Sequence, residues 1–173
     1  TANTTGANNV GVGTNALAAN TTGIDNIAIG TSALLLSTIG TQNVAIGSTA
    51  LTANTTGANN IAVGYAALDA NTTGVNNIAV GANALGANIV GIQNIAIGTG
   101  ALLVATADSN IAIGSAALDA NTTGASNVAI GVDALGANTT GTTNTAVGYG
   151  AGITITTGDG NTLLGYGAAT GSA

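Results

Sequence analysis

Residues 60–76 read Asn-Ile-Ala-Val-Gly-Tyr-Ala-Ala-Leu-Asp-Ala-Asn-Thr-Thr-Gly-Val-Asn, and variants of this phrase fill nearly the whole chain. Successive copies begin 17 residues apart, except for one step of 16 residues between positions 94 and 110. A short fixed period predicts a stack of coils in which each unit buries its apolar surface on its neighbours. The asparagines that begin the ten copies are Asn9, Asn26, Asn43, Asn60, Asn77, Asn94, Asn110, Asn127, Asn144 and Asn161.

Each copy of the phrase predicts a strand, a corner, a second short strand and a turn. In residues 60–64, Ile61 and Val63 alternate with smaller or polar residues, as in a β-strand. The glycine that follows the strand indicates a corner that needs a positive φ or a close backbone approach. Ala-Leu then predicts a short inward-facing segment, and Asn-Thr-Thr-Gly predicts the return turn.

Stacking of these coils predicts an all-β chain, a parallel β-roll or β-solenoid of ten coils with like residues in register. One inter-strand spacing per coil, about 4.8 Å, makes the rod roughly 48 Å long. Residues 1–173 are expected to form this single repeat domain, as a segment of a longer chain. The anchoring asparagines suit such a stack, because stacked amides hydrogen-bond to one another.

The composition excludes several classes of function. The chain contains no Lys, Arg, His, Glu, Cys, Pro, Met, Trp or Phe, and its six aspartates give a net charge of −6. Nucleic acid and anionic membrane surfaces are therefore poor partners, because no cation is present to meet a phosphate. No apolar run approaches the roughly 20 residues of a membrane helix. The usual pairs of nucleophile and base cannot be built, so we expect no enzyme, cofactor or metal centre.

The middle residue of the strand predicts a contact between chains. It is Ala in eight coils, Gly11 in the first and Leu163 in the last, and never a charged residue. We therefore expect both strand faces to be buried, with Val and Ile inside the coil and Ala against another chain. The reverse assignment, and a monomeric solenoid with a flat alanine face, stay open. The alanines expected at the subunit contact are Ala28, Ala45, Ala62, Ala79, Ala96, Ala112, Ala129 and Ala146.

The phrase Asn-Val-Ala-Ile-Gly-x-x-Ala, at residues 43–50 and 127–134, resembles the head repeats of trimeric autotransporter adhesins. Related phrases with Asn-Thr-Thr-Gly connectors are similar to repeats in phage tail fibres and bacterial surface proteins. The resemblance implies a left-handed parallel β-roll and a homotrimer, intertwined or side by side. These coils are longer than those of the family, and no neck, stalk or membrane barrel is present in the sequence.

These observations favour an extracellular rod on a bacterial surface or a virion fibre, which attaches to a host surface, a matrix protein or a glycan. The rod would have no direct membrane contact in this segment, and its copies could also join end to end. The alternative is a purely structural filament or tail-fibre segment that binds nothing. A third hypothesis is an ice-binding solenoid, suggested by the regularly spaced threonines.

Three weaker signals have simple structural explanations. The Asn-Thr-Thr sequons would place glycans about one strand spacing apart, so stacked turn amides explain them better. The sequence Gly158-Asp159-Gly160-Asn161 only faintly resembles a calcium-binding turn. Apolar turns, such as Ile89-Val90, are either a binding patch or a place that a neighbouring chain covers. The sequons begin at Asn3, Asn20, Asn54, Asn71, Asn121 and Asn138.

Overall fold

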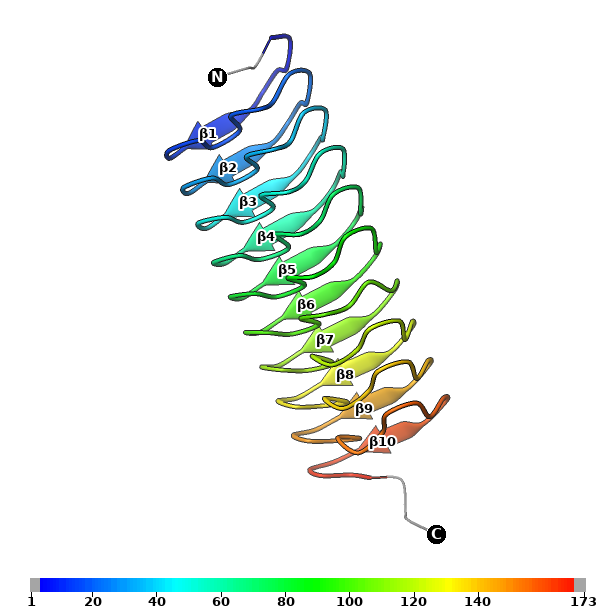
Figure 1. The fold of residues 1–173 in the computed structure, drawn as a ribbon. Coiled ribbons are helices and arrows are strands. Elements are labelled where there is room, and N and C mark those ends of the chain that lie inside the picture. Colours follow the sequence, from blue (N-terminus) through cyan, green and yellow to red (C-terminus); the bar gives the residue numbers. More distant parts are fainter. Residues whose placement is uncertain (1–3, 170–173) are drawn as a thin grey trace.

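The computed structural model describes residues 4–169, which form an all-β solenoid without any helix. Ten coils are stacked into a rod, and each coil contributes one strand to a single parallel sheet whose spatial order follows the sequence (Figure 1). The strands are β1 (Val10–Val12), β2 (Ile27–Ile29), β3 (Val44–Ile46), β4 (Ile61–Val63), β5 (Ile78–Val80), β6 (Ile95–Ile97), β7 (Ile111–Ile113), β8 (Val128–Ile130), β9 (Thr145–Val147) and β10 (Thr162–Leu164).

Equivalent residues of neighbouring coils lie directly opposite one another. Between β4 and β5, for example, Ala62 pairs with Ala79, and the flanking residues pair in the same register. The sixth coil is one residue shorter than the others, yet Ala96 of β6 still pairs with Ala112 of β7. The sequence-based prediction of parallel, in-register stacking is confirmed, and the missing residue is absorbed outside the sheet.

The glycine after each strand makes the predicted corner. Gly64 has a φ of +142°, in a region that side chains with a Cβ rarely adopt. A Cβ on this residue would lie only 2.6 Å from the carbonyl oxygen of Gly81 in the next coil. Both the backbone conformation and the close approach of successive corners therefore require glycine.

The Ala-Leu segment faces inward, as expected, but it is not a strand. Ala67 and Leu68 are both fully buried, whereas an extended strand places neighbouring side chains on opposite faces. The backbone instead has left-handed φ values of 50° at Ala66 and 54° at Leu68. The segment still joins the coils, because the Leu68 amide donates to the carbonyl of Ala84 over 2.9 Å.

The anchoring asparagines form a buried hydrogen-bond ladder along the rod. Asn60 is fully buried, and its Oδ1 accepts from the backbone N of Asn77 at 3.0 Å and from Nδ2 of Asn77 at 3.2 Å. Its own Nδ2 donates to the carbonyl of Gly74 in the same coil over 2.8 Å. The ladder therefore ties each coil to the next and also closes each coil on itself.

A second buried asparagine ladder runs through the Asn-Thr-Thr-Gly turns, but it is interrupted. Nδ2 of Asn71 donates to Oδ1 of Asn54 over 2.9 Å, and Nδ2 of Asn88 donates to Oδ1 of Asn71 over 3.2 Å. In the sixth coil Ala105 takes the asparagine position, so the buried Oδ1 of Asn88 has no hydrogen-bond partner. The ladder therefore continues only where the sequence supplies consecutive asparagines.

Candidate interaction surface

The outer face of the sheet carries two columns of apolar side chains. In the first eight coils, the first and third residues of every strand are Val or Ile, and each is partly or well exposed. In these coils, the more exposed side chains of the two columns have exposed fractions between 36%, at Ile27, and 56%, at Val12. In the last two coils, Thr145 and Thr162 occupy the first column. This uncharged flat strip is the main candidate for contact with another molecule.

The alanines predicted at the subunit contact lie on the opposite, inner face, so that prediction is corrected. Their side chains are fully covered by their own chain and cannot touch a partner. The alanines concerned are Ala28, Ala45, Ala62, Ala79, Ala96, Ala112, Ala129 and Ala146, each with 0% exposure. The reverse assignment, with Val and Ile outside, is the one that the fold has.

The width of the coil explains why alanine is inside. A Cβ placed on Gly11, at the same coil position, would lie 3.7 Å from the Leu17 side chain and 3.9 Å from Cβ of Ala16. These are ordinary contact distances, so the interior has room for one methyl group at this position. Larger β-branched side chains must therefore point outward, although they are more hydrophobic.

In the last two coils, the interior of the solenoid is filled by a different pair of inward-facing residues. Gly152 replaces the inward leucine of the ninth coil, and Leu163 replaces the inner alanine of the tenth. A Cβ on Gly152 would lie 2.8 Å from the Leu135 side chain and 3.4 Å from the Leu163 side chain. Leu135 and Leu163 therefore occupy the space that a leucine at position 152 would take.

The described sequon asparagines are core residues and not glycan acceptors. Asn20, Asn54, Asn71, Asn121 and Asn138 are all fully buried, while Asn3 lies outside the described residues. Asn121 donates from Nδ2 to the carbonyl of Gly124 over 2.8 Å. An amide nitrogen that is buried and hydrogen-bonded cannot carry a sugar in this fold, which confirms the interpretation as stacked turn amides.

Threonines at the first turn position form the expected ladder. The Thr55 hydroxyl, for example, donates to the carbonyl of Thr72 over 3.1 Å, and the Thr139 hydroxyl donates to the carbonyl of Thr156 over 3.0 Å. These hydroxyl protons are therefore used within the chain. The threonines lie in turns and not on a strand, so the row is the rim of the solenoid and not part of its flat face.

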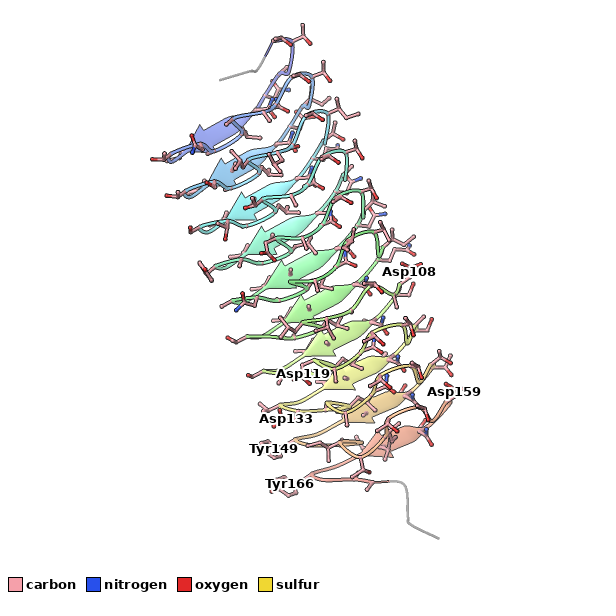
Figure 2. All side chains as sticks on the ribbon, viewed as in Figure 1. Asp108, Asp119, Asp133, Tyr149, Asp159 and Tyr166 are labelled. Carbon is pink, nitrogen blue, oxygen red and sulfur yellow. The ribbon has the colours of Figure 1, made fainter. Side chains whose placement is uncertain are left out.

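Four of the six aspartates can be placed at the two edges of the rod. Asp119 and Asp133 lie toward the edge that carries Tyr149 and Tyr166, and Asp108 and Asp159 lie at the opposite edge (Figure 2). Burial raises the pKa of Asp119 above its ordinary value, and the nearby charge of Asp133 adds to this increase, against two backbone hydrogen bonds that lower it.

The carboxylate of Asp159 belongs to the turn that faintly resembles a calcium loop. Its Oδ1 accepts from the Thr142 amide at 2.6 Å and from the Thr142 hydroxyl at 3.0 Å, and these bonds lower the pKa of Asp159. Within residues 4–169 no three metal-ligating side chains gather into one group. The contacts of Asp159 in this fold therefore join two coils.

The tyrosines follow the corner glycine and stand at the surface. Tyr149 and Tyr166 belong to successive coils, and their rings stack with centroids 5.3 Å apart and planes inclined by 10°. Their exposed fractions are 53% and 84%, and Tyr65 is 62% exposed. The stack extends the ladder of like side chains to aromatic residues.

Among the described residues, no helix is long and apolar enough to cross a membrane. No protein-family model matches the chain, and no curated protein or solved structure shows a significant similarity to it. The resemblance to adhesin head repeats therefore rests on the repeated phrase itself.

Proposed function

We propose that this chain is a stiff segment of an extracellular homotrimeric fibre, whose copies meet through the outer face of Val and Ile. The observation that carries the proposal is the unbroken apolar face of the first eight coils. The resemblance to adhesin head repeats supplies the number three and the location at a cell surface or on a virion.

The physical support comes from the sheet itself. Purely parallel sheets occur almost only where both faces are covered. Here the coil covers one face with its own Ala-Leu segment, and the other face stays exposed in the single chain. Three residues across and eight coils along give this strip a footprint of roughly 400 Å². The largest apolar patch on a typical monomer is about this size and is often functional.

A second copy of the chain suits this strip better than a charged partner. The strip contains no ionisable side chain, and the entire chain lacks cations. Two such strips are alike in shape, and both are apolar, so their contact needs no compensating charge. Another copy of the same strip would bury it without leaving a polar group unpaired.

In this assembly the chain contributes length and a regular surface. The coils are joined by backbone ladders and by buried amides along the rod, which makes the solenoid stiff. Adhesion would then use the surfaces left outside the trimer, including the turn edges. The alternative, a filament or tail-fibre segment that binds nothing, shares the same rod.

Sedimentation equilibrium tests the assembly. We expect a mass three times the chain mass of 16.0 kDa. A mass of one chain over the whole concentration range would contradict the proposal. Retention of the folded trimer on immobilised collagen, fibronectin or host glycans would then distinguish an adhesive head from an inert spacer.

A further inference from the structure

The second coil carries large aliphatic side chains around its turn, where most coils carry smaller or polar residues. Leu35 and Leu36 follow the inward Ala-Leu pair, and Ile39 takes the second threonine position of the turn. Leu36 and Ile39 are 47% and 52% exposed. Ile24, which follows the turn of the first coil, is 41% exposed. These four residues form the first edge patch.

A second edge patch lies on the fifth and sixth coils. Leu103 and Val104 follow the inward Ala-Leu pair of the sixth coil, and both are 37% exposed. Val90 and Ile92 belong to the turn region of the fifth coil, and Val90 is 55% exposed. The Ala87 amide donates to the carbonyl of Leu103 over 2.9 Å, so the two coils lie side by side here. The second edge patch therefore consists of Val90, Ile92, Leu103 and Val104.

The two patches occupy equivalent positions. Ile24 and Ile92 hold the same place in the first and fifth coils, and Leu35-Leu36 and Leu103-Val104 hold the same places in the second and sixth coils. Four coils, at one inter-strand spacing each, separate the patches by roughly 19 Å along the rod. The coil fold does not require these side chains, because six coils have alanine at the position of Leu36.

An aspartate lies beside each patch. Oδ1 of Asp108 accepts from the Ile92 amide over 2.8 Å, and Figure 2 shows Asp108 at the turn edge. Asp25 follows Ile24 in the sequence, and its Oδ1 accepts from Nδ2 of Asn8 over 2.9 Å. Among residues 4–169, the second carboxylate oxygen of each aspartate makes no hydrogen bond. Each patch therefore presents aliphatic surface together with an unpaired negative charge.

These charges decide which partner fits the patches. A second copy of the chain would bring further carboxylates and no cation, since the chain contains no Lys, Arg or His and has a net charge of −6. The outer strip differs, because it has no ionisable side chain. A partner with Lys or Arg next to its aliphatic side chains can cover each patch and pair its carboxylate. In such a contact the charges select the partner, and the buried aliphatic area supplies most of the affinity.

We propose that the two edge patches together bind a basic amphipathic segment of another protein, whose aliphatic side chains cover the patches and whose Lys or Arg side chains meet Asp25 and Asp108. An α-helix of about 13 residues spans the roughly 19 Å between the patches, so one helix of about four turns reaches both. This inference rests on the adhesive part of the proposed function and not on the homotrimer, because both patches belong to one chain.

Isothermal titration calorimetry with a designed peptide tests the patches. The probe is an α-helical peptide of about 18 residues, with leucines along one face and lysines elsewhere. A second peptide has glutamate in place of every lysine. We expect the Leu/Lys peptide to bind and the Leu/Glu peptide to show no binding at the same concentrations. Equal binding of the two peptides would overturn the inference.

A patch variant takes its new residues from another coil of the same chain. The four substitutions are Leu35→Thr, Leu36→Ala, Leu103→Thr and Val104→Ala. They copy Thr52-Ala53 of the third coil, so the solenoid should stay folded, as judged by circular dichroism. We expect the Leu/Lys peptide to bind about tenfold more weakly, because four aliphatic side chains leave the contact. An unchanged affinity would overturn the inference.

A matched control removes exposed apolar side chains from the opposite edge. Tyr65→Ala/Val132→Thr changes two residues at the coil position of Tyr149, and the new residues are those that Ala82 and Thr99 provide at the same position. We expect this variant to bind the Leu/Lys peptide as the wild-type chain does. A loss equal to that of the patch variant would mean that the peptide does not recognise the patches, and the inference would fail.

Removing the two charges tests the choice of partner, and it decides the question if the patch variant does not fold. In Asp25→Asn/Asp108→Asn the amide oxygens can still accept the hydrogen bonds of the carboxylates. We expect the Leu/Lys peptide to bind about threefold more weakly at low salt. Asp119→Asn/Asp133→Asn removes the same charge from the opposite edge and should leave the affinity unchanged. Equal weakening in the two variants would show attraction to net charge alone and would contradict the proposal.

Sedimentation keeps this inference separate from the proposed function. If the wild-type chain alone gains mass with concentration beyond its assembly, and the patch variant does not, a second copy occupies the patches and the inference is overturned. A chain that is retained on immobilised host molecules but does not bind the Leu/Lys peptide also loses the inference, although its adhesive function stands. A folded chain with the mass of one copy that binds the peptide at the patches contradicts only the homotrimer.

Discussion

The two faces of each short strand differ in a way that reverses the usual relation between hydrophobicity and burial. The inner face of β4 presents Ala62 and continues the line of Asn60, both fully buried. The outer face presents Ile61 and Val63, which are larger and more hydrophobic and yet partly exposed.

The comparison shows that space and hydrogen bonding decide orientation in so narrow a coil. The interior at the strand accepts one methyl group, and a neighbouring asparagine can be buried because its amide group is fully bonded. Branched side chains have no room inside, so they form a surface that only another molecule can cover.

Removing an inner amide should have the largest effect. In Asn60→Ala the Asn77 backbone amide loses its acceptor, and Gly74 and Asn43 lose a donor. We expect a loss of about 3–5 kcal/mol in unfolding free energy, since each orphaned buried group costs about 1–3 kcal/mol. Chemical denaturation measures it. Asn76→Ala, at an exposed neighbour with a φ of 60°, should cost only about 1 kcal/mol. Similar losses in the two variants would contradict the buried ladder.

Enlarging one face at a time should give the next effect. Ala79→Leu overfills the coil and should destabilise it by about 1–3 kcal/mol. Val80→Leu introduces a leucine at the neighbouring position on the outer face, where the single chain leaves room, so we expect a smaller loss of stability. Thermal unfolding of both variants checks the difference. If Val80→Leu unfolded at the lower temperature, the assignment of inner and outer faces would be wrong.

Acidification should have the smallest effect on stability. It tests the aspartates at the edges of the rod and not the two strand faces. Burial raises the pKa of Asp69 and Asp119 above the ordinary 3.8. As the pH falls from neutrality, these carboxylates are therefore protonated in the folded state before they are protonated in the unfolded state. The free energy of unfolding increases over this range. The pKa of Asp159 is lowered, so its contribution is retained down to 3.8 and is lost only below that value.

The melting temperature between pH 7 and 3 measures this balance. We expect a maximum near pH 4, roughly the ordinary aspartate value. The double variant Asp69→Asn/Asp119→Asn should lose the rise toward that maximum. A profile that falls steadily from pH 7 in both proteins would contradict the assignment.

Repetition made the architecture predictable. The anchoring asparagines indicate the coils, and the corner glycines, such as Gly64, indicate positions where a Cβ does not fit. The second segment was predicted as a strand because Ala-Leu gives no sign of its left-handed φ values. Those values arise from burying Ala67 and Leu68 together, which is a tertiary requirement.

The prediction of which strand face points into the coil was wrong, although the sequence contains the information needed to choose correctly. Asn60 and Ala62 lie on the same strand face, and the repeat itself predicts hydrogen-bonded columns of asparagine amides. If the amides are buried in the coil, the alanine beside them is buried there too. Hydrophobicity favoured the opposite choice, because it takes no account of the available volume.

The most direct test of the account puts a charge on each face in turn. In Ile78→Asp/Val80→Asp, both carboxylates lie on the outer strip, so we expect a folded solenoid whose sedimentation mass falls to one chain, 16.0 kDa. Ala79→Asp, at the residue between them, should abolish the fold, as judged by circular dichroism. If the outer double variant unfolded, or the alanine variant stayed folded, the central assignment of the two faces would be contradicted.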